Sequence, residues 1–215
     1  MSVAFETPDQ STVRPSWCVA ASSLLVVLVL SFLAYPAIGS DTITWDLVDI
    51  EQRSHSPFQE KSVRAVALVF ISTDCPIANS YQPLLRRLAD AFEPKGIRFF
   101  LVHPTAGLSI EDARSHRDEY GIRSPVVVDA DQSLTRAVNA TVTPQAIIFT
   151  RDVQDAVYRG RIDNRYATFG KKRNVATTSE FADALSDIVA GREVAVRETK
   201  AVGCLISFKS SLDKD

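Results

Sequence analysis

The sequence predicts an α/β sandwich in which helices cover both faces of one mostly parallel sheet. Three observations lead to this prediction. Apolar, β-rich runs alternate with runs that have helical spacing, in the order β-α-β-α-β-α-β-β-α. The first run, RAVALVF at 64–70, is continuously apolar, as expected for a strand buried on both faces. The segment after it carries one wide apolar stripe, which is typical of a helix that packs on a sheet.

Composition limits the domain number and the partners. The chain has 215 residues, of which 46% are apolar and 23% are charged, and this suits one globular domain with an accessory segment. The net charge is −2 and the sequence pI is about 5.9. Such a balance gives no basic field, so we expect no nucleic-acid partner.

Residues 1–40 are predicted to form a membrane anchor or a signal segment. No charge occurs between Arg14 and Asp41, and the apolar run WCVAASSLLVVLVLSFLAYPAIG is long enough to span a bilayer. The small residues at 37–39 also fit a signal-peptide cleavage site, so both alternatives stay open. Arg14 precedes the run and acidic residues follow it. We therefore expect residues 41–215 outside the cytoplasmic membrane, on its periplasmic side or secreted to the periplasm.

The first elements of the exported part follow from hydrophobic periodicity. TITWDLVDI (42–50) reads as a short edge strand, and the strand at 64–70 comes next. The helix after it has its apolar residues on one face, at Ile77, Tyr81, Leu84, Leu85, Leu88 and Phe92. Charged residues occupy the opposite face, so this helix is expected to pack against the sheet.

The remaining elements alternate in the same way. Ser109 is a suitable N-cap for a helix that Gly121 ends, and Gly191 ends the last helix. Arg151–Gln154 has the length of a hairpin loop. The predicted strands are 96–104, 124–130, 143–150 and 155–162, and the predicted helices are 109–120, 131–140 and 178–191.

Cys75 is the first candidate for chemistry. It lies after the buried strand at 64–70, at the sheet edge where open α/β sheets place their sites. Pro76 suits the first helical turn, which puts Cys75 at or near the N-cap. Free backbone N–H groups and the helix dipole stabilise a thiolate there, so the pKa of Cys75 is expected to be lowered. The alternative is a purely structural cysteine.

The strand, the TDCP motif, the amphipathic helix and the later TVTP motif together resemble the thioredoxin fold over roughly residues 43–191. This resemblance implies a three-layer sandwich with a mixed central sheet. It also implies a proline in cis that faces the active-site cysteine, and the matching position is Pro144, after Thr143. Pro83 matches the kinking proline found eight residues beyond the first cysteine.

Within that superfamily the chain resembles the redoxin group, which includes alkyl hydroperoxide reductase and thiol-specific antioxidant proteins of the exported bacterial type. Two positions depart from the family patterns. Ala78 stands where Cys-x-x-Cys has its second cysteine, and Leu68 stands where peroxiredoxins have proline. Ser72 fills the peroxiredoxin hydroxyl position. The resemblance also implies an arginine that stabilises thiolate and peroxide, with Arg161 or Arg165 as the candidate.

The cysteine count suggests a partner for Cys75. Cys18 falls in the N-terminal apolar run, which leaves Cys75 and Cys204 for the exported part. Two thiols in an oxidising compartment indicate a disulfide or a redox couple, although two unrelated buried cysteines remain the alternative. Cys204 lies on a tail at 196–215, beyond the domain at 41–195. We expect it to resolve an oxidised Cys75.

The function predicted from these residues is thiol redox chemistry. Cys75 is the expected nucleophile for a protein disulfide or peroxide substrate, Cys204 its resolving thiol, and an upstream thiol the reductant. Ser72, Pro144 and Arg161 complete the predicted site, and no cofactor is expected. The rival prediction is a non-enzymatic redoxin-like domain that binds a redox partner or copper through Cys75.

Histidines and a basic loop bear on that rival prediction. Copper chaperones of this fold have Cys-x-x-x-Cys and a distant histidine, but Asn79 stands at the second cysteine position. His103 is expected to approach Cys75 or to cap a strand end, whereas His55 and His116 are expected at the surface. The loop at 159–174 carries six basic residues and one acid. It is predicted to be solvated or to dock an acidic redox partner.

Overall fold

The computed structural model describes residues 46–151 and 155–209. The chain divides into two compact units, residues 1–40 and residues 41–215, and the description below concerns the second. The predicted anchor or signal segment lies outside the described residues. Within the described ranges, no helix combines the length and the apolar character that crossing a membrane requires.

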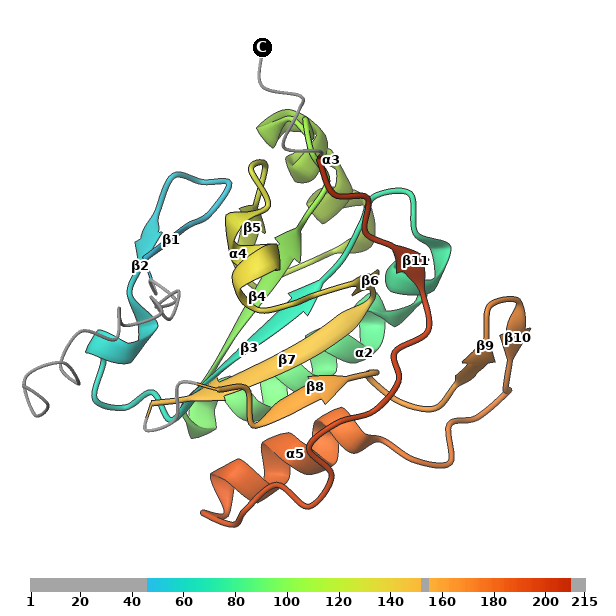
Figure 1. Ribbon diagram of the computed structural model, residues 1–215. Coiled ribbons are helices and arrows are strands. Elements are labelled where there is room, and N and C mark those ends of the chain that lie inside the picture. Colours follow the sequence, from blue (N-terminus) through green and yellow to red (C-terminus); the bar gives the residue numbers. More distant parts are fainter. Residues whose placement is uncertain (1–45, 152–154, 210–215) are drawn as a thin grey trace, which may run out of the picture. The chain divides into compact units, whose positions relative to one another are not determined.

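A five-stranded mixed sheet forms the centre of this unit (Figure 1). Its strand order is β5 (Val126–Val128), β4 (Ile97–His103), β3 (Ala65–Phe70), β7 (Gln145–Thr150) and β8 (Tyr158–Gly160). The strands β3, β4 and β5 are parallel, whereas β7 and β8 run antiparallel to their neighbours. The mostly parallel sheet expected from the alternation of elements is thus corrected, whereas the mixed central sheet that the resemblance to the thioredoxin fold implies is confirmed.

Helices pack on the two faces of this sheet because successive side chains of β3 point to opposite sides. Ala65, Ala67 and Val69 belong to a core cluster that includes residues of α2 (Pro76–Phe92) and α5 (Glu180–Val189). The alternate residues of β3 belong to a second cluster, which Leu134 of α4 (Ser133–Ala137) joins. Ala113 places α3 (Ile110–Tyr120) with the first cluster. Every residue of β3 is buried, as the continuous apolar run predicts.

Several predicted elements change in extent. The predicted strand 143–150 is divided at Pro144 into β6 (Val142–Thr143) and β7. Ser109 and Gly121 cap α3 as expected: the Ser109 hydroxyl accepts from the Asp112 N–H at 3.0 Å. The remaining short elements are β1 (Leu47–Val48), β2 (Ser54–His55), β9 (Tyr166–Thr168), β10 (Lys171–Lys172), β11 (Cys204–Leu205) and the 3-10 turns η2 (Pro57–Gln59) and η3 (Glu93–Lys95).

The prediction that residues 42–50 form an edge strand of the central sheet is wrong, because β1 pairs elsewhere. This strand pairs with β2 in a separate two-stranded sheet. It therefore does not border the central sheet, although Leu47 still packs in the second core cluster.

Strand β4 ends at a buried histidine. The His103 side chain is 0% exposed, and neither ring nitrogen has a hydrogen-bond partner among the described residues. Its ring lies edge-on to that of His116, with 5.0 Å between ring centroids. His116 is itself buried, and its Nε2 lies 2.9 Å from Asn79 Oδ1, so the expected surface position of His116 is wrong. Burial lowers the pKa of His103 to about 3.

His103 should make the protein sensitive to acid. In the unfolded chain the imidazole binds a proton below its ordinary pKa of 6.5, whereas in the folded chain it stays neutral down to about 3. The free energy of unfolding therefore falls as the pH drops through this window, by up to about 1.4 kcal/mol per pH unit for one proton.

We expect His103→Leu to reduce this slope, because leucine does not titrate, and to leave stability at pH 7 unchanged or higher. Chemical denaturation between pH 7 and pH 4 measures both quantities against the unmodified chain. An unchanged slope would show that His103 does not contribute.

Candidate active site

Cys75 is the N-cap residue of α2. Its backbone is extended (φ −94°, ψ 102°), and Pro76 occupies the first helical turn, as the sequence predicts. The sulfur accepts from the backbone N–H of Ala78 at 3.5 Å. Cys75 is 1% exposed, so the thiol faces the helix N-terminus inside the protein.

The sulfur of Cys75 also contacts the backbone of β6. The Thr143–Pro144 peptide bond is cis, which confirms the prediction from the TVTP motif. The Cys75 thiol donates to the Thr143 carbonyl at 3.0 Å. The start of α2 and the cis-proline segment are 68 residues apart in the chain, and this contact brings them together at one thiol.

Cys204 lies next to this contact between Cys75 and Thr143. It belongs to β11, which pairs antiparallel with β6 so that Cys204 is opposite Thr143 (Figure 1). Its sulfur lies 2.7 Å from the sulfur of Cys75, and both residues are free cysteines. The structure thus brings together two thiols that are separated by 129 positions. At this distance the Cys204 sulfur can attack a disulfide formed at Cys75.

The two thiols differ in acidity. Burial alone would raise the pKa of Cys75, but the hydrogen bonds from the Cys204 thiol and from the Ala78 N–H outweigh it, and the pKa is lowered. Burial together with the neighbouring Cys75 raises the pKa of Cys204 to about 12. Cys75 is therefore the thiol that ionises first, and Cys204 keeps its proton as the hydrogen-bond donor.

The predicted arginines have carboxylate partners. The Nε of Arg161 donates to Glu180 at 3.1 Å, and Arg165 donates to Asp163 at 3.2 Å. The structure therefore places each guanidinium in an ion pair, and Arg161 lines a small pocket together with Pro144. A role of Arg161 at the thiolate stays a prediction.

Ser72 lies beside the thiol pair. Its carbonyl accepts from the Cys75 N–H at 3.3 Å. It also lines a cavity of about 250 Å³ that Cys204 lines as well. Ser72 is therefore part of the immediate surroundings of the pair.

Sequence reasoning missed the residues that hold the tail. The segment 196–209, called the strap below, lies along β8, β6 and α4. Near its end, the buried amide of Gln132 donates to the Ser207 carbonyl at 2.7 Å and accepts from the Lys209 N–H at 2.9 Å. Near its start, the Thr199 N–H donates to the Arg159 carbonyl at 3.0 Å. No local pattern marks Gln132 for this role, because its partners are some 75 positions away.

The histidines do not complete a metal site. Asn79 donates to the Thr73 carbonyl at 2.8 Å and contacts His116. In the described part of the chain, no group of three or more His, Cys, Asp or Glu residues is arranged to hold a metal ion.

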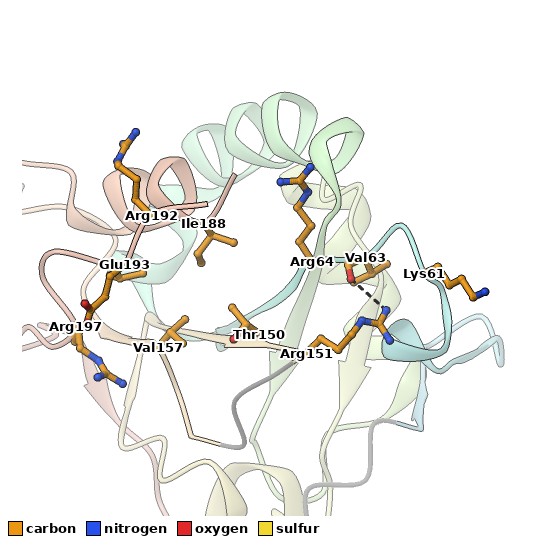
Figure 2. A pocket seen from close by; sticks show the side chains of 11 residues that line it. Lys61, Val63, Arg64, Thr150, Arg151, Val157, Ile188, Arg192, Glu193 and Arg197 are labelled. Atoms are coloured by element: carbon orange, nitrogen blue, oxygen red, sulfur yellow. Dashed lines mark hydrogen bonds between the residues drawn. The ribbon is translucent and has the colours of Figure 1, made fainter. Parts of the chain in front are cut away.

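A second cavity, of about 610 Å³, lies at the other end of the sheet (Figure 2). Thr150 lines it and pairs with Ala65 at the start of β3, whereas Cys75 follows the end of that strand. Figure 2 shows Arg151 turned toward Val63, whose carbonyl accepts from it at 3.2 Å. This cavity has basic residues around it but no cysteine, so it is separate from the thiol pair.

Comparison with known proteins finds solved structures that are similar to this chain. No family model and no curated protein matches the chain. An uncharacterized conserved protein from Geobacillus kaustophilus is similar with 27% identity and a TM-score of 0.68, over 79% of this chain and 91% of that chain. A hypothetical protein from Sinorhizobium meliloti is similar with 20% identity and a TM-score of 0.67, over 83% and 98% of the two chains. A secreted disulfide oxidoreductase from Mycobacterium tuberculosis has 16% identity and a TM-score of 0.48, over 69% and 96%.

Proposed function

We propose that this chain is a thiol–disulfide oxidoreductase in which Cys75 is the attacking thiolate and Cys204 the resolving thiol. The observation that carries the proposal is the 2.7 Å separation of two free thiols whose pKa values are shifted in opposite directions. A thiol with a lowered pKa is ionised to a greater extent, and the thiolate is the nucleophile in disulfide exchange. The protonated neighbour can then attack the mixed disulfide that this thiolate forms. The substrate class is a protein disulfide.

The proposed reaction has two exchange steps. Because Cys75 is closed to solvent while the strap is docked, the strap first moves aside. The Cys75 thiolate then attacks one sulfur of the substrate disulfide, forms a mixed disulfide and releases the other substrate sulfur as a thiolate, which takes up a proton. Cys204 then loses its proton and attacks the Cys75 sulfur, which releases the second substrate thiolate. The substrate gains two electrons and the Cys75–Cys204 disulfide forms. An upstream thiol reductant restores the two thiols.

Disulfide reduction fits the site better than peroxide reduction. Peroxide reduction would benefit from a free guanidinium near Cys75, but Arg161 is held by Glu180 and Arg165 by Asp163. The rival proposal of copper binding has less support, because Cys75 is engaged by Cys204 and by the Thr143 carbonyl.

We further propose that the domain works outside the cytoplasmic membrane, attached by an uncleaved N-terminal segment. The apolar run before Asp41 supports this proposal. The full chain should fractionate with membranes and resist carbonate extraction. A mature protein that begins at Ser40 would instead identify the segment as a cleaved signal peptide, and N-terminal sequencing distinguishes the two outcomes.

Substitution of each cysteine tests the assigned roles. Cys75→Ser should abolish thiol-dependent reduction of a disulfide substrate such as insulin, because the nucleophile is lost. Cys204→Ser should allow one turnover and then accumulate a mixed disulfide on Cys75, which mass spectrometry detects. Cys18→Ser serves as the matched control and should keep full activity.

Two outcomes would contradict these roles. Full activity of Cys75→Ser would exclude the redox assignment altogether. Normal cycling of Cys204→Ser would show that Cys75 works as a single-cysteine site.

The pKa of Cys75 should depend on the donor at position 204. Cys204→Ala removes the thiol that donates to Cys75, so the pKa of Cys75 should rise, whereas Cys204→Ser keeps a hydroxyl donor and should hold it low. Thiolate absorbance in the ultraviolet, followed against pH, measures the shift. Cys75→Ser provides the baseline. Equal pKa values in the Ala and Ser variants would show that this hydrogen bond is not the cause.

A further inference from the structure

The strap holds Cys204 in place from both sides. Upstream, the Thr199 N–H donates a hydrogen bond to the Arg159 carbonyl, and the Arg197 carbonyl accepts one from the Arg159 N–H. Downstream, the Ile206 N–H donates to the Thr141 carbonyl at 2.9 Å, one residue before β6. Cys204 lies between these anchors, paired with Thr143. The docked strap therefore fixes the sulfur of Cys204 against that of Cys75.

The docked strap also decides which sulfur an outside group can reach. Cys75 is 1% exposed and Thr143 is 2% exposed, so both are closed to solvent in this arrangement. Cys204 is half-buried, and Leu205 beside it is largely exposed. An external thiol therefore meets Cys204 first.

A cavity leads to Cys204. It has a volume of about 250 Å³ and lies between the strap and the loop that follows β4. Its lining residues include Cys204 but not Cys75, and none of them carries a charge: Ser72, Pro104, Thr105, Ala106, Thr143, Cys204, Leu205, Ile206 and Ser207. A water molecule occupies roughly 30 Å³ of liquid, so this space accepts several non-hydrogen atoms. Its uncharged wall suits a thiol compound that carries no other charged group, because an anionic group such as a sulfonate would lose hydration without gaining a partner.

We propose that this cavity is the reductant site of the oxidised protein, and that the incoming uncharged thiol attacks Cys204 rather than Cys75. The inference rests on the proposed function, because it requires the Cys75–Cys204 disulfide. The reductant enters as a neutral thiol and loses its proton to water as it attacks. Its sulfur forms a bond to the Cys204 sulfur, the Cys75–Cys204 bond breaks, and Cys75 leaves as a thiolate. A second reductant thiol attacks the mixed disulfide, which yields the oxidised reductant and the Cys204 thiol.

The acidity of the two thiols also supports attack at Cys204 rather than at Cys75. Exchange is faster when the leaving thiol has the lower pKa. Attack at Cys204 releases Cys75, whose pKa is lowered, whereas attack at Cys75 would release Cys204, whose pKa is raised. Access and leaving-group chemistry thus select the same sulfur.

Adduct mapping tests the proposal on the full chain. The protein is oxidised with diamide, treated briefly with 2-mercaptoethanol, quenched with acid and analysed by peptide mass spectrometry. We expect the mercaptoethanol adduct on Cys204 in roughly tenfold or greater excess over Cys75. Its anionic analogue, 2-mercaptoethanesulfonate, should react more slowly. An adduct that is equal or greater on Cys75 would overturn the proposal, and an equal rate with the sulfonate would overturn the preference for an uncharged thiol.

Two substitutions separate the cavity from the strap. Ala106→Phe should fill part of the cavity and slow adduct formation several-fold, whereas Ala106→Ser is the matched control and should keep the original rate. At Gly203 an added Cβ would lie 2.0 Å from the Thr143 carbonyl oxygen, so Gly203→Ala should displace the strap and abolish the preference for Cys204. An unchanged rate in a folded Ala106→Phe protein would exclude the cavity as the route.

The same experiment distinguishes this inference from the proposed function. If diamide produces no Cys75–Cys204 disulfide, the resolving role of Cys204 fails and the inference fails with it. If the disulfide forms and the adduct appears on Cys75, the resolving role stands and only the reductant site is wrong.

Discussion

The arrangement of the site depends on the pairing of two very short strands, β6 and β11. This pairing sets Cys204 opposite Thr143, and the Thr143 carbonyl in turn accepts from the thiol of Cys75. Close approach is possible because residue 203 is a glycine: any side chain there would meet the backbone of Thr143. A few backbone contacts therefore position a sulfur from the end of the chain against one at the start of α2.

This placement also explains how two chemically identical groups acquire different properties. Hydrogen bonds from the N-terminal turn of α2 and from Cys204 lower the pKa of Cys75. Burial and the neighbouring Cys75 sulfur raise the pKa of Cys204. A thioredoxin-like Cys-x-x-Cys pair would place both sulfurs on one helix. Here Ala78 occupies the second position, and the partner is supplied by the strap instead. The helix keeps its capping thiol, and the second thiol belongs to a segment that is anchored through hydrogen bonds at both ends.

Local sequence patterns predicted most of the central architecture. The apolar run of β3, the stripe of α2 and the Ser109 cap of α3 each depend on neighbouring residues, and each is present. The extended Cys75 followed by Pro76 was predictable for the same reason. The docking of the strap, the bonds of Gln132 and the burial of His116 were not, because they depend on contacts between distant parts of the chain. The alternation of elements did not predict the antiparallel direction of β7; the family resemblance implied only that the sheet is mixed.

The distance of 129 positions between Cys75 and Cys204 links oxidation state to conformational stability. In the chain-entropy model, a cross-link that closes a loop of about 100 residues raises the free energy of the unfolded chain by about 4–5 kcal/mol, because it removes conformational entropy. A thermodynamic cycle requires the converse: whatever the bond adds to the stability of the fold, the fold adds to the stability of the bond. The folded domain would then hold its own disulfide at a lower reduction potential than the unfolded chain could, and a partial loosening of the strap would make it easier to reduce.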